Sequence, residues 1–270
     1  MGKSQGSFSN RMKDYESREA GRRFIPLMPV IARLDGRAFH SFCKGMDKPF
    51  DFGFIRAMDD TARFMLEETR ALMAYVQSDE ITLLWHSEEY KSQIFFDGRI
   101  QKMASILAAL ASVKFSREIC DVFPDRSARM PVFDCRVWQV PNKTEAVNVF
   151  VWCEKDAIRN SIQAMAQSMY SSSELHGKGT AEQKKMVFIG GVDWDALSER
   201  VKKGAFYWRR KKLRKFSSDE IDKLPPKHAV RTNPDLMIER FGIESLEMPP
   251  LPMVVNRNDV FFDGADPSEG

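Results

Sequence analysis

Short apolar runs and amphipathic stretches follow one another in a fixed order over the first half of this 270-residue chain. Residues 54–73 and 99–114 carry apolar side chains at three- and four-residue steps, which is typical of helices that cover one face of a sheet. The runs predicted to be strands are residues 29–35, 75–76, 81–85 and 132–140. The order βαββαβ predicts an α/β (α+β) domain with a ferredoxin-like sheet, in which the first and third strands lie side by side at the centre.

The second half of the chain is predicted to be helical and basic. Apolar periodicity indicates helices at residues 146–152 and 156–169, whereas the last fifty residues are predicted to be loop-rich, with a frayed tail at 263–270. Residues 200–215 hold nine Lys or Arg and no Asp or Glu, interleaved with Phe, Tyr and Trp. This segment fits a polyanionic partner such as RNA, and a solvated basic helix with a buried aromatic stripe is the alternative.

Carboxylates stand at the ends of strands that are neighbours in this sheet. Asp35 ends the first strand, and Asp79 and Glu80 lie in the turn that leads into the third. Two unpaired carboxylates that approach each other raise each other's pKa unless a cation lies between them. Hard divalent cations, Mg²⁺ above all, prefer such oxygen ligands, and two of them can clamp a phosphoryl displacement. Acids that only polarise strand ends would show the same pattern, so both interpretations stay open.

Basic and polar residues that suit a triphosphate lie around these acids: Arg37, His40, Ser78, Arg99 and Lys102. Gly36 lets the backbone come close to a ligand. Arg99 and Lys102 stand one turn apart at the start of a predicted helix, where free N–H groups favour anions. Each residue alone is as easily a surface or structural group, but together they indicate phosphoryl-transfer chemistry.

The amino-acid composition excludes few classes of protein function. The 41 Lys and Arg against 38 Asp and Glu give a net charge of +3, which neither requires nor excludes nucleic acid. The four cysteines lack the spacing of zinc ligands, which favours a reducing compartment. No apolar run reaches the roughly eighteen residues of a membrane span, and the polar N-terminus is not a secretory signal. We therefore expect a cytoplasmic protein with no membrane partner.

Several motifs resemble those of the tRNA(His) guanylyltransferase and Thg1-like superfamily of 3′–5′ RNA polymerases. They occur in the family's order at Arg33–His40, Tyr75–Glu80, Arg99–Lys102, Phe133–Arg136 and His176–Thr180. The resemblance implies a polymerase-palm catalytic domain over residues 1–140. It also implies that the helical, basic C-terminal region, residues 141–270, binds tRNA and assembles subunits into a homo-tetramer or dimer.

The resemblance also implies roles for the residues that match the motifs. Two Mg²⁺ ions would be held by the side chains of Asp35 and Asp79 and by the carbonyl of Gly36, with Glu80 as a third catalytic acid. Residues implied to bind the GTP, ATP or other NTP substrates are Asp35, Gly36, Arg37, Ala38, Phe39, His40, Ser78, Asp79, Arg99 and Lys102. Residues expected to bind tRNA are Arg136 and Lys178, from the motifs, and Arg209, Arg210, Lys211 and Lys212, from the basic segment.

One stretch departs from the family's eukaryotic guanylyltransferases. They carry a His-Ile-Asn-Asn run, whereas residues 156–161 here are Asp-Ala-Ile-Arg-Asn-Ser, without the histidine. This difference resembles the Thg1-like branch and implies template-directed repair of truncated tRNA 5′ ends after activation by ATP or GTP. Dedicated guanylylation of tRNA(His) is the alternative. A palm-type nucleotidyl cyclase and a non-catalytic RNA-binding module are rivals of other classes; the basic segment argues against the first and the paired carboxylates against the second.

Overall fold

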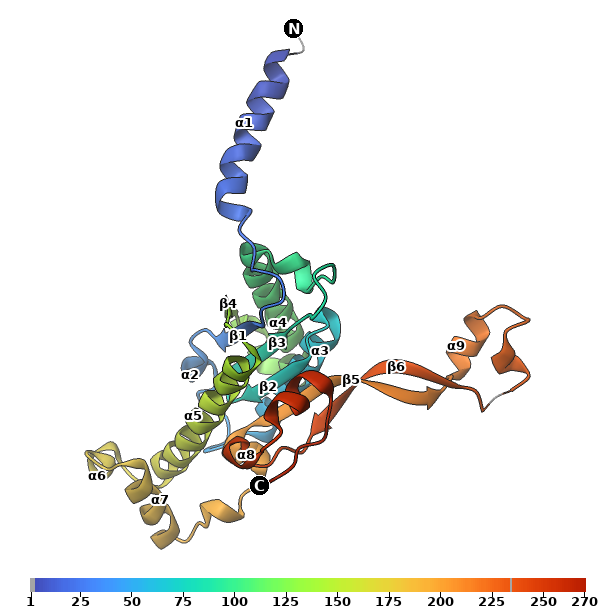
Figure 1. Ribbon diagram of the computed structural model, residues 1–270. Coiled ribbons are helices and arrows are strands. Elements are labelled where there is room, and N and C mark those ends of the chain that lie inside the picture. The colour runs from blue at the N-terminus through green and yellow to red at the C-terminus, as the bar shows by residue number, and fades with distance from the viewer. Residues whose placement is uncertain (1–2, 234) are drawn as a thin grey trace.

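A six-stranded antiparallel sheet lies at the centre of the computed structural model, which describes residues 3–233 and 235–270 (Figure 1). Its strands, in the spatial order β4-β1-β3-β2-β5-β6, are β1 (Val30–Gly36), β2 (Met73–Gln77), β3 (Glu80–Trp85), β4 (Phe133–Gln139), β5 (Ala205–Lys215) and β6 (Met237–Leu246). Helices α3 (Phe52–Thr69) and α4 (Ile100–Val122) cover one face and complete the βαββαβ order. The predicted ferredoxin-like arrangement is confirmed, with β1 and β3 adjacent.

Helix boundaries differ from the prediction at three places. Helix α3 ends at Thr69 because Arg70 adopts a left-handed conformation with φ 55°, and α4 continues to Val122. The opposite face of the sheet is covered by one helix, α5 (Lys143–Met169), where two were predicted. The predicted break is wrong because Glu154 is buried there, and its carboxylate accepts the backbone N–H of Leu251 at 2.8 Å.

An aromatic cluster fixes the segment that follows β1. The short helix α2 (Phe39–Phe42) directs the ring of Phe39 into the core. There its centroid lies 5.0 to 6.1 Å from those of Phe42, Phe54, Phe115 and Phe133. Offset and edge-on pairs at this spacing stabilise a core beyond the area that they bury. The loop after β1 is therefore anchored on α3, α4 and β4.

The sheet continues past residue 140, because β5 and β6 add to its β2 edge. The basic segment is therefore a strand, and its interpretation as a helix is wrong: α8 (Glu199–Lys203) ends at Gly204, whose φ of +81° favours glycine. The last fifty residues contain β6, and their tail folds back, since the N–H of Val255 donates to the carbonyl of Ser268 at 2.9 Å. The functional division at residue 140 stays a prediction.

Two elements project from this body (Figure 1). Helix α1 (Lys3–Ala20) leads away from the sheet, and the outer halves of β5 and β6 form a two-stranded arm, residues 209–243, that carries α9 (Ser218–Lys223) near its tip. The small helices α6 (Ser172–Leu175) and α7 (Thr180–Ile189) follow α5. Among the described helices, none has the length and apolar character that crossing a membrane requires.

Candidate active site

Three acidic residues lie opposite one another on adjacent strands at one end of the sheet. The register pairs Asp35 of β1 with Glu80 of β3 on one side and with Asp134 of β4 on the other. Residues opposed in this way share a face of the sheet, about 4.5 to 5.5 Å apart at Cβ, where like charges repel. Asp134 was not singled out from the sequence, because only the register shows that it faces Asp35.

Asp79 joins this end of the sheet through the two-residue turn between β2 and β3. Its carbonyl accepts the N–H of Gly36 at 3.1 Å, which ties the turn to the end of β1. The hydroxyl of Ser78, a residue with φ 45°, donates to the Asp79 carboxylate at 3.0 Å. Burial raises the pKa of Asp79, and the negative charge of Asp35 raises it further. The structure thus brings Asp35 and Asp79 together, and among the residues it describes no cation pairs with both carboxylates.

Glu80 has a charge partner within the chain. Burial raises its pKa, while Arg33, whose guanidinium lies 3.9 Å from the Glu80 carboxylate, acts in the opposite direction. Helix α5 holds Arg33 in place: Nη2 donates to the Sγ of Cys153 at 2.7 Å, and the guanidinium stacks 4.3 Å from the ring centroid of Trp152. Glu80 is therefore partly compensated, in contrast to Asp79.

The donor set at this end of the sheet suits a hard divalent cation. Ionising carboxylates of raised pKa costs free energy when no cation lies between them, and a bound cation removes that cost. The exposed Arg136 reaches Asp35 only at 3.6 Å. Among the described residues no three His, Cys, Asp or Glu side chains form a complete metal site. Mg²⁺ is commonly held by one or two carboxylates with substrate phosphates and water, so Asp35, Asp79 and the Gly36 carbonyl fit as the chain's share of its ligands.

A cavity of about 330 Å³ adjoins the predicted nucleotide loop. Arg37 and Ala38 line it together with Arg129, which no pattern in the sequence singles out. Arg37 and His40 are exposed. The ring of Phe39 is buried in the aromatic cluster, so its predicted nucleotide contact is limited to its backbone.

Arg99 and Lys102 lie at the other end of the sheet. They line a second, larger cavity of about 760 Å³ together with Trp85. Trp85 pairs with Val30, five residues along the strands from the pair that Asp35 forms with Glu80. At about 3.4 Å per residue, the two sites are roughly 17 Å apart along the sheet. The expectation that Arg99 and Lys102 bind the nucleotide stays a prediction.

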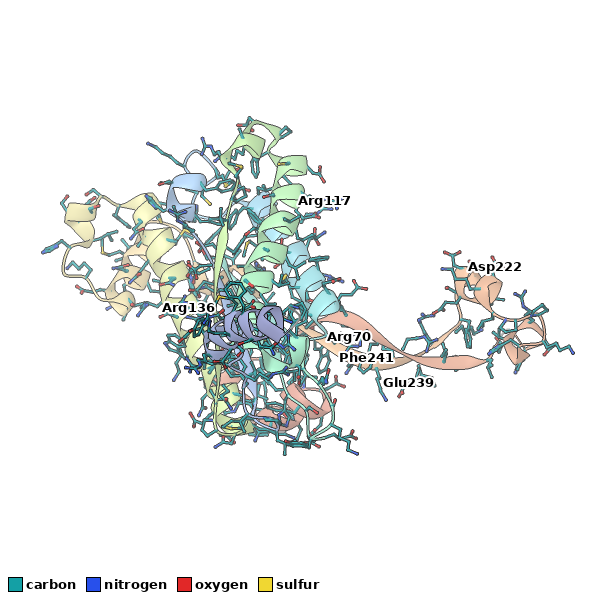
Figure 2. All side chains as sticks on the ribbon, turned by 90° about the horizontal axis from the view of Figure 1, so that it is seen from above. Arg70, Arg117, Arg136, Asp222, Glu239 and Phe241 are labelled. Carbon is teal, nitrogen blue, oxygen red and sulfur yellow. The ribbon has the colours of Figure 1, made fainter. Side chains whose placement is uncertain are left out.

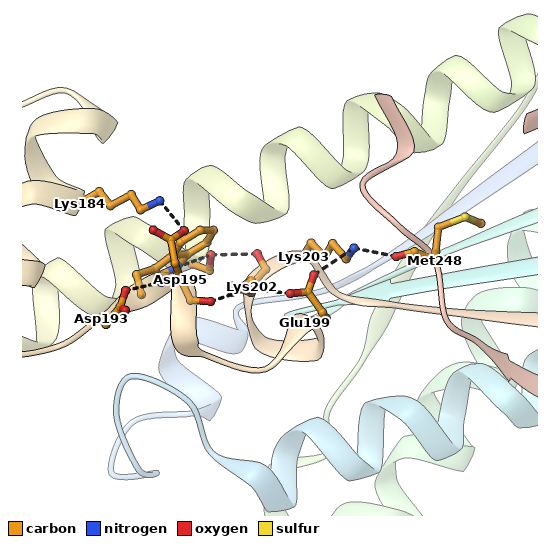
Figure 3. Close-up of polar contacts among 9 residues, drawn as sticks. Lys184, Asp193, Asp195, Glu199, Lys202, Lys203 and Met248 are labelled. Atoms are coloured by element: carbon orange, nitrogen blue, oxygen red, sulfur yellow. Dashed lines mark hydrogen bonds and ion pairs between the residues drawn. The ribbon is translucent and has the colours of Figure 1, made fainter. Parts of the chain in front are cut away.

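The basic segment is largely neutralised by acids from elsewhere in the chain. Eight of its nine cations have a carboxylate within 4.0 Å: Arg200, Lys202, Lys203, Arg210, Lys211, Lys212, Arg214 and Lys215. Figure 3 shows Glu199 with Lys202 and Lys203, whose Nζ also donates to the Met248 carbonyl at 2.7 Å. Lys178, predicted to bind tRNA, pairs with Glu182 at 3.0 Å. In the described part of the chain, the ninth cation, Arg209, has no carboxylate partner.

Several known proteins are similar to this chain. Residues 9–141 match the family model described as tRNAHis guanylyltransferase (Thg1). The tRNA(His) guanylyltransferase of Schizosaccharomyces pombe is 27% identical over 73% of this chain and 78% of its own length. An uncharacterised protein of Acanthamoeba polyphaga mimivirus is 27% identical, over 62% of this chain and 64% of its own length.

Solved structures of a bacterial tRNA(His) guanylyltransferase (Thg1)-like protein in complex with ATP and with GTP are 27% and 26% identical to this chain, with TM-scores of 0.74 and 0.68. Each alignment covers 91% of this chain and 94% of the solved one. The family model covers four of the five motifs and the strands β1 to β4, and the solved structures extend the similarity over most of the chain. The chain belongs to the tRNA(His) guanylyltransferase and Thg1-like superfamily.

Proposed function

We propose that this protein is a nucleotidyltransferase that adds nucleotides in the 3′–5′ direction to the 5′ end of tRNA. The observation that carries the proposal is the meeting of Asp35, Gly36 and Asp79 at one end of the sheet. Support also comes from the tRNA(His) guanylyltransferase relatives and from the ATP and GTP complexes of the bacterial relative.

The reaction has two steps. The 5′-monophosphate of the tRNA attacks the α-phosphorus of ATP or GTP, pyrophosphate leaves, and a 5′–5′ anhydride forms. The 3′-hydroxyl of the incoming NTP then attacks the tRNA 5′-phosphorus, loses its proton and displaces AMP or GMP. The chain becomes one nucleotide longer at its 5′ end and carries a new triphosphate.

Specific residues would serve these steps. Asp35, Asp79 and the Gly36 carbonyl would hold two Mg²⁺ ions, which when bound lower the pKa of the attacking hydroxyl and neutralise phosphate charge. Arg37 and Arg129 line the adjoining cavity, where they would orient phosphate groups. No protein nucleophile is required, because both attacking groups come from the substrates.

We further propose that the tRNA template, rather than a guanine pocket, selects the nucleotide. The residues that replace the His-Ile-Asn-Asn run lie on α5, where Asp156 and Arg159 pair with each other at 2.6 Å. This stretch lacks the histidine that the eukaryotic tRNA(His) guanylyltransferases carry there. Base pairing with the opposite acceptor strand supplies the missing discrimination.

The test uses two different tRNAs that lack their first nucleotide, each with all four bases at the opposing position. Addition of each of the four NTPs is measured with Mg²⁺. We expect C to direct addition of G, and A to direct addition of U, in both tRNAs. Uniform addition of G, or activity on tRNA(His) alone, would restore dedicated guanylylation, and no addition to any tRNA would refute the proposed function.

Assembly into a homo-dimer or tetramer is also part of the proposal. Phe8, Met12 and Tyr15 recur at four- and three-residue steps on the projecting helix α1, and all three are exposed. An exposed apolar stripe of this kind is typical of a surface that a subunit covers.

A further inference from the structure

A buried arginine lies beside the predicted nucleotide loop, residues 35–40, and takes no part in the proposed chemistry. Arg126 belongs to the short 3₁₀ helix η2 (Pro124–Arg129), and only 7% of it is exposed. Charged side chains are almost never buried this far unless they are paired. Among the residues that the structure describes, no carboxylate forms an ion pair with Arg126. Its positive charge must therefore be compensated by other groups.

The compensating groups are backbone carbonyls at the end of the short helix α2. Nη1 of Arg126 donates to the carbonyl of Phe42, the last residue of α2, and Nη2 donates to the carbonyl of Lys44 at 3.0 Å. The last carbonyls of a helix have no partner within the helix, and basic side chains can serve as their donors. The planar guanidinium reaches two carbonyls at once, which the single ammonium of a lysine does not do in the same geometry. Arg126 therefore clamps the chain where α2 ends.

This clamp is an inefficient way to stabilise the fold. Nε of Arg126 is buried without a hydrogen-bond partner in the described part of the chain. The guanidinium lies 6.0 Å from the ring centroid of Phe42 and 5.6 Å from that of Phe123, in surroundings that suit an apolar side chain equally well. Burying a charge and leaving a donor unpaired both cost free energy, so an apolar residue of similar volume is often as stable or more stable. The hydrogen bonds of Arg126 are therefore explained better by the position that they impose on α2.

Helix α2 transmits this position to the nucleotide loop because it has a single turn. It spans Phe39–Phe42, and the N–H of Phe42 donates to the carbonyl of Ala38 at 3.2 Å. Ala38 directly precedes the helix and has a left-handed conformation with φ 58°. A helix this short is not stable by itself, so its place depends on the groups that hold its ends. The buried ring of Phe39 holds one end in the core, and Arg126 holds the other.

Two further observations connect Arg126 with the site. The N–H of Arg37 donates to the carbonyl of Val132 at 2.8 Å, so the segment between η2 and β4 also holds the start of the nucleotide loop. Cys43, which follows α2, responds to charges on both sides. Burial raises the pKa of its thiol to about 11, the charge of Asp79 acts in the same direction, and that of Arg126 acts in the opposite direction. Arg126 and Asp79 thus lie close enough to act on one side chain.

We infer that Arg126 is a positioning residue for nucleotide addition, which acts through the carbonyls of Phe42 and Lys44 and touches no substrate. By fixing the single turn of α2, it fixes the backbone from Gly36 to Ala38, where the proposed function places a metal-binding carbonyl and phosphate groups. The inference rests on that proposed function. The described lining of the cavity beside the loop includes Arg129 and not Arg126, as expected of a residue that acts from outside the site. A displacement of about 1 Å at a reacting group costs on the order of a hundredfold in rate, and the clamp prevents such a displacement.

The test separates the position of the loop from the stability of the fold. Arg126→Met removes both hydrogen bonds with little change in volume, and Arg126→Lys keeps the charge but loses the fork of donors. The control is Arg117→Met, which removes an exposed arginine of α4 (Figure 2). Single-turnover addition to a 5′-truncated tRNA with Mg²⁺ gives the rate at saturating NTP and the half-saturating NTP concentration. Thermal unfolding gives the melting temperature, and hydrogen–deuterium exchange measures the amides of residues 36–43.

We expect the rate at saturating NTP to fall by about a hundredfold in Arg126→Met. The half-saturating NTP concentration should change by less than about threefold, because Arg126 contacts no substrate. The melting temperature should stay within about 4 °C of the wild type, and the amides of the loop should exchange faster. Arg126→Lys should have a rate between those of the wild type and Arg126→Met, and Arg117→Met should match the wild type in every measurement.

A wild-type rate in Arg126→Met would overturn the inference, and so would unchanged amide exchange in the loop. A rate that falls only in proportion to the melting temperature in both variants would also overturn it, because Arg126 would then be a structural residue. If Arg126→Met does not fold, Arg126→Lys decides, and a wild-type rate in that variant would refute the positioning role. A wild type that adds no nucleotide to any tRNA would refute the proposed function, whereas faster exchange in Arg126→Met would still show that Arg126 positions the loop.

Discussion

Replacing Gly36 with alanine should damage both the fold and the site, because no space exists for one more carbon. An ideal Cβ on Gly36 would lie 2.5 Å from two ring carbons of Phe39, far inside van der Waals contact. The ring cannot move aside, since it packs among four other phenylalanines. The loop after β1, or the ring, must therefore shift.

Overpacking of this kind costs about 1–3 kcal/mol of the free energy of unfolding. At about 2–4 °C per kcal/mol for a chain of this size, Gly36→Ala should melt roughly 2–12 °C below the wild type. A displacement of about 1 Å at a catalytic group costs on the order of a hundredfold in rate, so single-turnover nucleotide addition should fall by about that factor. Thermal unfolding and the addition assay measure the two effects.

The matched control is Gly242→Ala in the arm, another strand glycine. Nothing lies within 4 Å of its ideal Cβ, so the substitution should leave both readouts near the wild-type values. A Gly36→Ala variant with the melting temperature and addition rate of the wild type would refute the steric argument. A Gly242→Ala variant that falls equally would show that any glycine of the sheet is sensitive.

Three further predictions concern charge, core and assembly. Burial raises the pKa of Asp79, so the free energy of unfolding of the wild type without divalent cation should fall as pH rises from about 4 through that raised pKa. Asp79→Asn should remove this decline and be at least as stable as the wild type at pH 7. Chemical denaturation across pH measures both. Phe115→Ala, at the fully buried centre of the aromatic cluster, should cost about 3–5 kcal/mol in the same assay, and a decrease below about 1 kcal/mol would contradict the packing described. Phe8→Ser with Tyr15→Ser should shift the oligomer toward monomer in sedimentation velocity with unfolding unchanged, and an unaltered sedimentation profile would remove α1 from the interface.

The palm sheet was predictable because its signals are local. The strand over Val30–Gly36 is a short apolar run, the two covering helices carry clear amphipathic periodicity, and the order of these elements fixes which strands are neighbours. The same order places Asp35 near Asp79. Asp134 could be identified as part of the site only from the strand register, because no sequence pattern near it indicates that it faces Asp35.

Charge pairing could not be predicted where the partners lie far apart in the sequence. The basic segment contains no acid, yet Glu239 and Glu244 of β6 neutralise Arg210, Lys211 and Lys212 across the arm. Composition within one segment therefore overstates its free charge.

The positions of Arg99 and Lys102 relative to the acids follow from the chain direction. A helix that follows β3 must begin near Trp85, at the end of β3 opposite the Asp79 turn. The motif match alone does not show this separation along the sheet, and the binding of a nucleotide by Arg99 and Lys102 stays a prediction.

The central claim is that Asp35 and Asp79 serve nucleotide addition. Its most direct test compares the variants Asp35→Asn and Asp79→Asn with the wild type. The rate of single-turnover addition to a 5′-truncated tRNA is measured at saturating Mg²⁺. Asp222→Asn, on the exposed helix of the arm tip, is the control for loss of one carboxylate. Charge stabilisation of several kcal/mol corresponds to about a thousandfold in rate, so both site variants should lose at least that factor and keep tRNA affinity within about twofold. Addition near the wild-type rate in either site variant would contradict the claim.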